Sequence, residues 1–422
     1  MSSSDIQQQL AILRRRIARI DRKYASGATA GPIAVPRPDE ERPERYAVEE
    51  YLNGVEVNTP AGTHFESERL WERHRRHGSM DISTLAELPA NLLESISEGL
   101  IKNSPPARWA FLDTETTGLA GGTGTYAFLV GVGNIAPEGF RLKQFFMRDY
   151  GEEPSLLHAL NEHLAGFDVL ITYNGKTYDQ PLLETRFRMA RLRPPFARLR
   201  HLDLLHGARR LWKLRFESCR LVALETEVLG VERQGDLPGE MIPYVYFEYL
   251  RTREAFRVAP IFHHNALDIL TLACLTGIVP WAFQSPAEAP LHHGADLVGL
   301  ARWLRAAERY DEAIQLFRRA MDSNISDELL FHTMWDAALL EKKLGRPGGA
   351  LALFTDLAAA RNPYRAAALE ELAKHYEHRE RNYPMALEMT RAALALGESG
   401  ALRKREARLA KRAARPRPRR LL

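Results

Sequence analysis

One stretch of the chain decides the fold, and it reads Phe111-Leu112-Asp113-Thr114-Glu115-Thr116-Thr117-Gly118-Leu119. Its apolar first residues predict the buried start of a strand. Side chains at i and i+2 lie on the same face of a strand, so Asp113 and Glu115 place two carboxylates side by side. Such carboxylates repel each other unless a cation lies between them, and hard divalent cations prefer oxygen ligands. An acidic strand end that only precedes a turn is the alternative interpretation.

The residues around this stretch predict an α/β layer fold. Strands are expected over residues 109–112, 126–133, 141–147 and 168–173. Helices are expected over residues 155–165, 180–192, 202–214, 218–229 and 265–275. Three close strands, followed by a helix, a strand and further helices, indicate a mixed sheet flanked by helices.

Two more carboxylates stand at positions that need an explanation. Asp179 follows the strand over residues 168–173 and begins a helix, where it acts either as an N-cap or as part of a site. Asp268 interrupts the apolar face of a later helix, just after His263 and His264. A carboxylate on an apolar helix face is costly unless it is paired or bound to a metal.

Taken in order, these motifs resemble those of the DEDD exonucleases of the ribonuclease H-like superfamily. The finer resemblance is to the bacterial YprB-type ribonuclease H-like proteins, and it rests on residues 113–126, 173–179, 236–243 and 264–268. It covers about residues 109–283. The resemblance implies a ribonuclease H-like nuclease domain over residues 106–285, followed by a tetratricopeptide-like helical region.

The resemblance also implies the residues of the site. Carried over by position, the acidic ligands of two Mg²⁺ or Mn²⁺ ions would be Asp113, Glu115, Asp179 and Asp268. The superfamily places a His five residues before the last Asp or a Tyr four before it, and here His263 and His264 fill both spacings. Helical i, i+4 spacing puts His264 on the face of Asp268 and favours it as the base, whereas His263 could act from a preceding loop.

Further residues are expected to bind substrate. The hydroxyls of Thr116 and Thr117 could bind a phosphate or a terminal hydroxyl, or merely form a turn, and Asn174 joins this set. Residues 186–220 hold eleven Lys/Arg and two acidic residues, with aromatic residues between them. Such a segment suits single-stranded nucleic acid, although solvated helix faces are the alternative. The arginines expected to contact substrate are Arg191, Arg193, Arg198 and Arg200.

The rest of the chain is predicted to divide into four segments. Residues 1–26 form a basic helix, residues 27–105 a linker and an unassigned extension, residues 286–400 a helical domain, and residues 401–422 a basic tail. Ala313, Ala350 and Ala386 are spaced by 37 and 36 residues, close to the repeat length of about 34 in tetratricopeptide units. An ordinary helical bundle is the alternative. The tail either contacts a polyanion or is simply solvated.

Composition excludes several classes of protein. The 422 residues are 45% hydrophobic and 27% charged, which is typical of a globular protein. Two distant cysteines provide neither a disulfide framework nor a four-cysteine zinc site, so we expect a cytoplasmic protein. The longest apolar run is too short to span a membrane and contains a proline, so we expect no membrane association.

The sequence therefore predicts a metal-dependent nuclease, acting as a 3′–5′ exonuclease on single-stranded DNA or RNA. The main alternative is a non-catalytic nucleic-acid-binding scaffold whose helical region recruits a protein partner. An endonuclease that acts on structured nucleic acid is a third possibility. DNA and RNA remain equally open, because no motif reports contacts to a 2′-hydroxyl.

Overall fold

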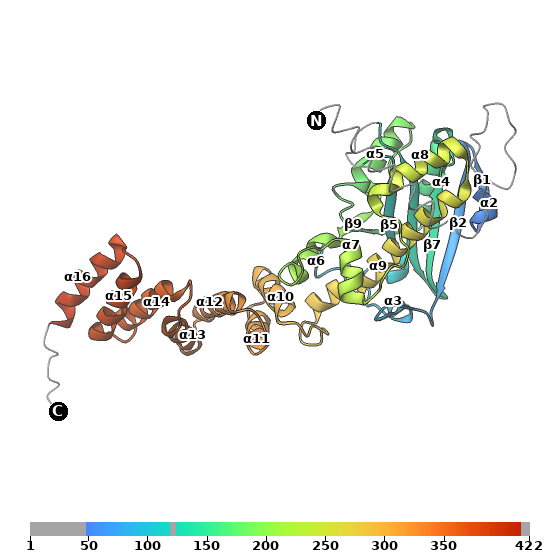
Figure 1. Cartoon of the computed structure of the whole chain (residues 1–422). Helices are drawn as coiled ribbons and strands as arrows, with labels where there is room; N and C mark the ends of the chain where they lie inside the picture. Colours follow the sequence, from blue (N-terminus) through green and yellow to red (C-terminus); the bar gives the residue numbers. More distant parts are fainter. Residues whose placement is uncertain (1–47, 119–123, 415–422) are drawn as a thin grey trace, which may run out of the picture. The chain divides into compact units, whose positions relative to one another are not determined.

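The computed structural model of the chain describes residues 48–118 and 124–414 (Figure 1). The basic helix predicted over residues 1–26 lies outside the described residues. The described parts form one large sheet with helices around it, followed by a run of helices. This confirms the predicted fold class of a ribonuclease H-like mixed sheet flanked by helices and followed by an all-α region.

The large sheet has seven strands in the order β1-β2-β7-β6-β5-β8-β9. Strand β5 is central, antiparallel to β6 and parallel to β8, which is in turn parallel to β9. The strand bounds are β1 (Gly54–Thr59), β2 (Gly62–Glu72), β5 (Trp109–Thr116), β6 (Ala127–Ala136), β7 (Gly139–Phe146), β8 (Val169–Thr172) and β9 (Arg200–Asp203). A separate small ribbon pairs β3 (Arg76–His77) with β4 (Met80–Asp81), followed by the short helix α3 (Ser83–Ala86).

Two of these strands lie where the sequence had indicated only a linker and an unassigned extension. Strand β2 pairs along eight residues with β7 and brings β1 with it, so the sheet is wider than predicted. Strand β9 also corrects a prediction, because the helix expected over residues 202–214 begins only after it. Both corrections concern edge segments whose short apolar patterns do not distinguish strand from helix or loop.

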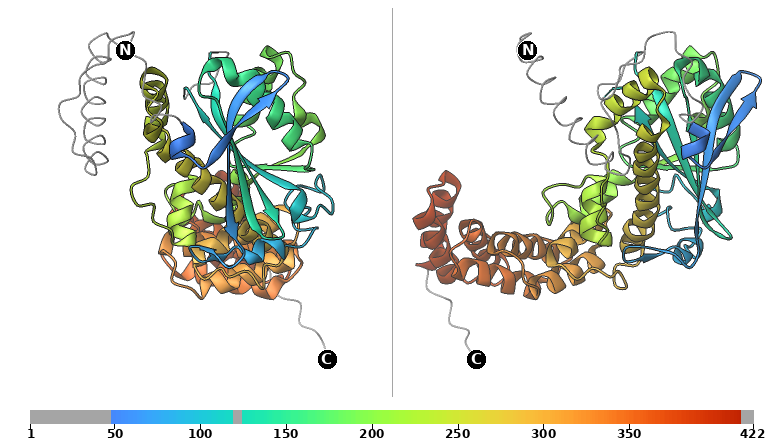
Figure 2. Two further views of the ribbon diagram at one scale, coloured as in Figure 1. Left: turned by 90° about the vertical axis from the view of Figure 1, so that its right-hand side faces the viewer. Right: turned by 45° about the vertical axis from the view of Figure 1, so that its right-hand side comes forward.

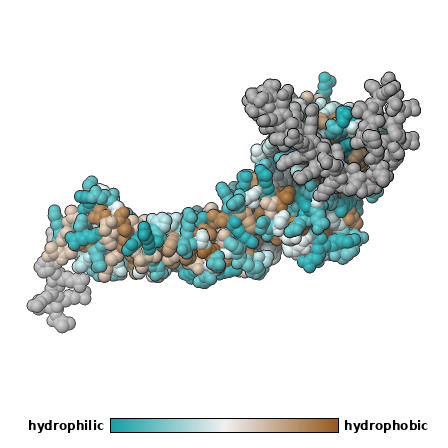
Figure 3. All heavy atoms as spheres, viewed as in Figure 1, coloured by the Kyte–Doolittle hydropathy of each residue, from teal (hydrophilic) through white to brown (hydrophobic). Residues whose placement is uncertain are grey.

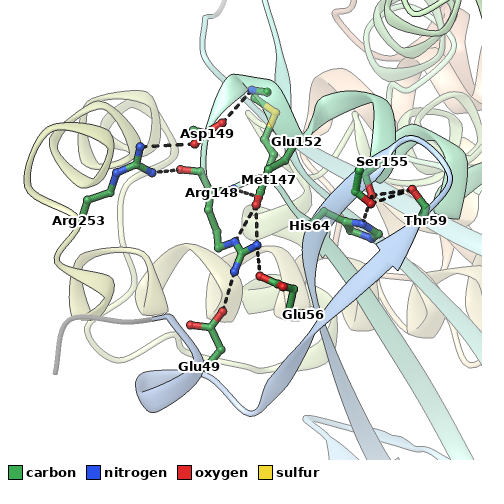
Figure 4. A network of polar contacts seen from close by, with 12 residues as sticks. Glu49, Glu56, Thr59, His64, Met147, Arg148, Asp149, Glu152, Ser155 and Arg253 are labelled. Atoms are coloured by element: carbon green, nitrogen blue, oxygen red, sulfur yellow. Dashed lines mark hydrogen bonds and ion pairs between the residues drawn. The ribbon is translucent and has the colours of Figure 1, made fainter. Parts of the chain in front are cut away.

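Polar contacts, some of them buried, fasten the added hairpin to the rest of the domain (Figure 4). The Arg148 guanidinium binds Glu49 at 2.9 Å and both Glu56 and Glu152 at 2.6 Å. On β2, the His64 Nδ1 atom lies 2.8 Å from the Ser155 hydroxyl, which also donates to the carbonyl of Gly62 at 2.9 Å. Neither His64 nor Ser155 is exposed to solvent, so this serine–histidine pair is a structural anchor and not a nucleophile.

The long helix α9 (Ala259–Gln284) forms the core of the domain and packs against β5, β6 and β7 (Figure 2). A glycine makes this approach possible, because a Cβ atom at Gly131 on β6 would lie 2.2 Å from the Asn265 side chain. By length and apolarity the segment Ala255–Gln284 could cross a membrane, but 78% of its most apolar window is buried in the fold, as in a core helix. The other helices are α2 (Val48–Tyr51), α4 (Glu153–Leu164), α5 (Asp179–Met189), α6 (Leu204–Trp212), α7 (Leu221–Leu224), the π-helix η6 (Glu225–Leu229) and α8 (Ile242–Thr252).

Seven further helices pack one against the next in chain order. They are α10 (Gly294–Ala306), α11 (Tyr310–Met321), α12 (Asp327–Lys343), α13 (Pro347–Ala359), α14 (Arg365–His378), α15 (Tyr383–Leu396) and α16 (Gly400–Ala413). Ala313, Ala350 and Ala386 are all buried in these helices, but a tetratricopeptide repeat remains a prediction. In the view of Figure 3, hydrophobic residues interrupt the hydrophilic surface along this region.

Helix α16 occupies the first part of the segment predicted to be a basic tail. Leu402 and Leu409 are buried, and the carboxylate of Glu377 on α14 binds Arg405 and Arg408, each at 2.9 Å. The basic charge there belongs to a packed helix. The first part of the predicted basic tail is therefore a packed helix rather than a freely solvated segment, and residues 415–422 lie outside the described part.

Candidate active site

The four predicted carboxylates lie on strand β5 and on two helices next to it, α5 and α9. Asp113 and Glu115 lie on β5, Asp179 is the first residue of α5, and Asp268 lies on α9. Burial and the charges of Asp268 and Asp179 raise the pKa of Asp113 well above its ordinary value. Burial and the charge of Asp113 do the same to the pKa of Glu115. Charges act strongly only at short range in water, so the structure brings all four groups into one cluster.

A neighbouring side chain holds each of the three aspartates. The Thr114 hydroxyl donates to Asp179 Oδ1 at 2.5 Å, and the Asn265 amide donates to Asp113 Oδ2 at 2.9 Å. Asp179 is not a helix cap, because Tyr178 occupies that position. Burial nevertheless raises the pKa of Asp179 to about 6 and also raises that of Asp268. The neighbouring donors therefore do not fully offset the cost of ionising these carboxylates.

Sequence reasoning missed Arg233, which supplies the positive charge beside this cluster. Its guanidinium donates to Asp268 Oδ1 at 2.5 Å and to Asp236 Oδ2 at 3.1 Å, and it also ion-pairs with Glu225. Only 5% of the Arg233 side chain is exposed, and Glu225 is fully buried. No periodic or spaced pattern indicates Arg233, because it lies in a loop and its partners are spread over more than 40 residues.

The geometry distinguishes the two candidate histidines. His264 is buried, with Nδ1 2.9 Å from Asp236 Oδ2 and Nε2 3.6 Å from Asp268 Oδ2. Burial acts to lower the pKa of His264, but the Asp236 hydrogen bond and the Asp268 charge outweigh it and raise that pKa. His263 is exposed and lies inside α9 rather than in a preceding loop, and partial burial together with Arg69 lowers its pKa. Only His264 contacts the carboxylates.

Three of the predicted substrate contacts already have structural partners. Thr116 donates to the Gly118 carbonyl at 2.9 Å, and the Thr117 hydroxyl accepts from the Tyr126 amide at 3.0 Å. At Asn174 it is the backbone amide, and not the side chain, that donates to Asp203 Oδ1 at 2.8 Å. All three residues shape loops next to the carboxylates, so contact with substrate remains a prediction for each.

The structure does not bring the predicted arginines to the carboxylates. Arg191 and Arg193 follow the far end of α5, whose eleven residues extend about 16 Å from Asp179. Arg198 donates to the Asn161 carbonyl at 3.1 Å. Arg200 is in register with Val169, which pairs with Trp109 at the opposite end of β5 from Asp113.

The donor chemistry of the cluster fits Mg²⁺ or Mn²⁺. Four neighbouring carboxylates with raised pKa values supply hard oxygen ligands, and their ionised forms need positive charge. Within residues 48–118 and 124–414, however, no three His, Cys, Asp or Glu side chains are gathered closely enough to hold an ion. Asp268 is instead paired with Arg233 in this arrangement.

Comparison with known proteins agrees with this fold. Residues 110–279 match the model of the RNase_H superfamily, which supports a nuclease-type hydrolase acting on nucleic acid. The chain is also 34% identical over 329 residues to the Bacillus subtilis (strain 168) protein named "Uncharacterized protein YprB", spanning 76% of this chain and 77% of that protein. The chain therefore belongs to the YprB family and carries a domain of the ribonuclease H superfamily.

Proposed function

We propose that this protein is a metal-dependent nuclease that shortens single-stranded nucleic acid from its 3′ end. One observation carries the proposal: four carboxylates from three elements lie together, partly or fully buried, and burial and neighbouring charges raise the pKa values of Asp113 and Glu115. Burying such charges lowers stability, so a purely structural role gives no reason for keeping them. The superfamily match supports the nuclease class.

The residues divide the chemistry among themselves. Asp113, Glu115, Asp179 and Asp268 would hold two Mg²⁺ or Mn²⁺ ions, which when bound polarise the attacked phosphodiester and the attacking water. Asp236 accepts from Nδ1 of His264, so a neutral ring has its unprotonated Nε2 on the side of Asp268. That nitrogen is suited to accept the proton of the attacking water. Asn265 keeps the Asp113 carboxylate oriented.

A non-catalytic nucleic-acid-binding scaffold is the second candidate, and one observation favours it. Arg233 ion-pairs with Asp268, and a carboxylate neutralised in this way is a weaker metal ligand. In such a protein the fold would bind nucleic acid, and the helical region α10–α16 would recruit a protein partner.

A cleavage panel separates these functions. The substrates are DNA and RNA, single- and double-stranded, each labelled at either the 5′ or the 3′ end and incubated with Mn²⁺ or EDTA. We expect a 5′-labelled single strand to shorten stepwise with Mn²⁺ and a 3′-labelled strand to release its label at once. Internal fragments would instead indicate an endonuclease. Binding without cleavage of any substrate would refute the nuclease and favour the scaffold.

A further inference from the structure

Two cavities adjoin along the outer edge of β9, away from the carboxylates. Their volumes are about 530 and 440 Å³, and both are lined by Leu100, Ile101 and Arg200, so they form one continuous hollow. We call this hollow the β9 groove. Its walls are residues 96–104, strand β9 and the start of α6, with the Lys176 and Arg210 side chains also lining it.

At one end of the β9 groove, hydrogen bonds join β9 to the loop that precedes the predicted metal ligand Asp179. Asp203, at the end of β9, accepts from the backbone amides of Asn174 at 2.8 Å and Lys176 at 3.2 Å. The charge of Asp203 also acts to raise the pKa of Asp179, so the two carboxylates are close. The opposite end, at Arg200, lies about 10 Å further along the strand. The groove therefore runs from the Asp179 loop alongside the sheet.

The β9 groove has unbalanced positive charge. Four exposed cations line it, and none of them ion-pairs with a carboxylate in the described parts of the chain: Lys102, Lys176, Arg200 and Arg210. Of the acidic side chains in its wall, Asp168 is bound to Arg108 at 2.7 Å and Asp203 binds the loop amides. Glu98 and the charged Asp203 therefore stand against four cations, which leaves an excess of positive charge along the groove. Unpaired cations spaced along a hollow are suited to bind the phosphates of a nucleic-acid strand.

We propose that the β9 groove binds the sugar–phosphate backbone of a single nucleic-acid strand as it passes the Asp179 loop. The inference rests on the proposed function for what happens to that strand at the carboxylates. Cavities of this size are typical of small-ligand pockets, which favours a single strand over a duplex as the occupant. Of the arginines predicted from the sequence, this assigns a place to Arg200 and adds Lys102, Lys176 and Arg210.

Salt-dependent binding tests the groove without requiring catalysis. The groove variant combines Lys176→Gln, Arg200→Gln and Arg210→Gln. The matched control carries the same charge change at three exposed arginines of the helical region that have no ion pair in the described residues: Arg319→Gln, Arg361→Gln and Arg379→Gln. Binding of a fluorescent single-stranded oligonucleotide is measured by anisotropy in EDTA at several salt concentrations. Because Arg210 lies 5.2 Å from the Trp303 ring, a double variant without the Arg210 change guards against misfolding.

Each lost phosphate contact should reduce the log–log salt slope by about 0.7 on a single strand. We expect the groove variant to lose about 2 from the slope, the double variant about 1.4, and the control variant nothing. An unchanged slope in both groove variants, or equal losses in groove and control variants, would overturn the proposal. If the variants show the expected slopes but the wild type never cleaves with Mn²⁺, the proposed nuclease function is refuted and the proposed groove stands. If the wild type cleaves but the groove variants keep the wild-type slope, only the proposed groove is refuted.

Discussion

Replacing Arg233 with methionine tests whether the Arg233 charge stabilises the folded protein by balancing the neighbouring carboxylates. The Arg233 guanidinium is 5% exposed and contacts Glu225, Asp236 and Asp268. The substitution keeps much of the side-chain volume but removes the charge. Glu225, which is fully buried, would retain only its contacts with His77 at 3.1 Å and with Thr271 at 2.8 Å.

The expected loss is large. Removing one partner of a buried ion pair costs about 3–5 kcal/mol, because the other charge stays buried without its partner. Asp268 would then join the other carboxylates without a compensating cation. Mn²⁺ should therefore raise the free energy of unfolding more in Arg233→Met than in the wild type, since ligand binding to the folded state stabilises it.

The assay is urea unfolding with and without millimolar Mn²⁺. Arg186→Met is the matched control, because Arg186 is also buried and binds Glu153 at 2.5 Å, but on the far half of α5. We expect both variants to be destabilised and only Arg233→Met to be rescued preferentially by Mn²⁺. A loss below about 1 kcal/mol in Arg233→Met, or equal rescue of both variants, would refute the reasoning.

Three further predictions concern the histidines, Asp179 and helix α16. In steady-state kinetics, His264→Ala should reduce turnover by roughly 10²-fold or more, and His263→Ala should reduce it only slightly. Equal mild losses would exclude both histidines as the base. Because burial raises the pKa of Asp179 to about 6, the folded protein binds this proton more tightly than the unfolded chain does. Relative to Asp179→Asn, the wild type should therefore lose roughly 3 kcal/mol of unfolding free energy in EDTA as the pH rises from about 4 to 6. The same pH dependence in both proteins would contradict this. If α16 contacts nucleic acid, Lys404→Gln with Lys411→Gln should reduce the salt slope of binding at an unchanged melting temperature, and an unchanged slope would count against that contact.

Much of the fold could be predicted because its central strands are continuous apolar runs. The predicted strands over residues 109–112, 126–133, 141–147 and 168–173 correspond to β5, β6, β7 and β8. Strands β1, β2 and β9 were missed because they have mixed polarity and their pairing is decided by tertiary contacts. The same limit applies to α16, because its many lysines and arginines mask in the sequence pattern the two leucines that pack against the neighbouring helices.

The candidate site was predictable only in part. Asp113 and Glu115 were found from strand alternation, and Asp179 and Asp268 from their positions at helices. Arg233 could not be found, because its role depends on a loop that folds back onto α9, and no local pattern encodes that contact. Substrate contact of the predicted arginines stays a prediction. Arg191 and Arg193 lie away from the carboxylates because closeness to Asp179 in sequence does not give closeness in space when a helix of eleven residues intervenes.

The central claim is that the carboxylate cluster is the site of metal-dependent cleavage. Its most direct test compares the wild type with Asp113→Asn and with Asp356→Asn, an exposed control on α13, on one end-labelled single strand with Mn²⁺. We predict that the wild type and Asp356→Asn shorten the strand at similar rates, that EDTA stops both, and that Asp113→Asn does not cleave. No cleavage by the wild type, or equal cleavage by Asp113→Asn, would contradict the account.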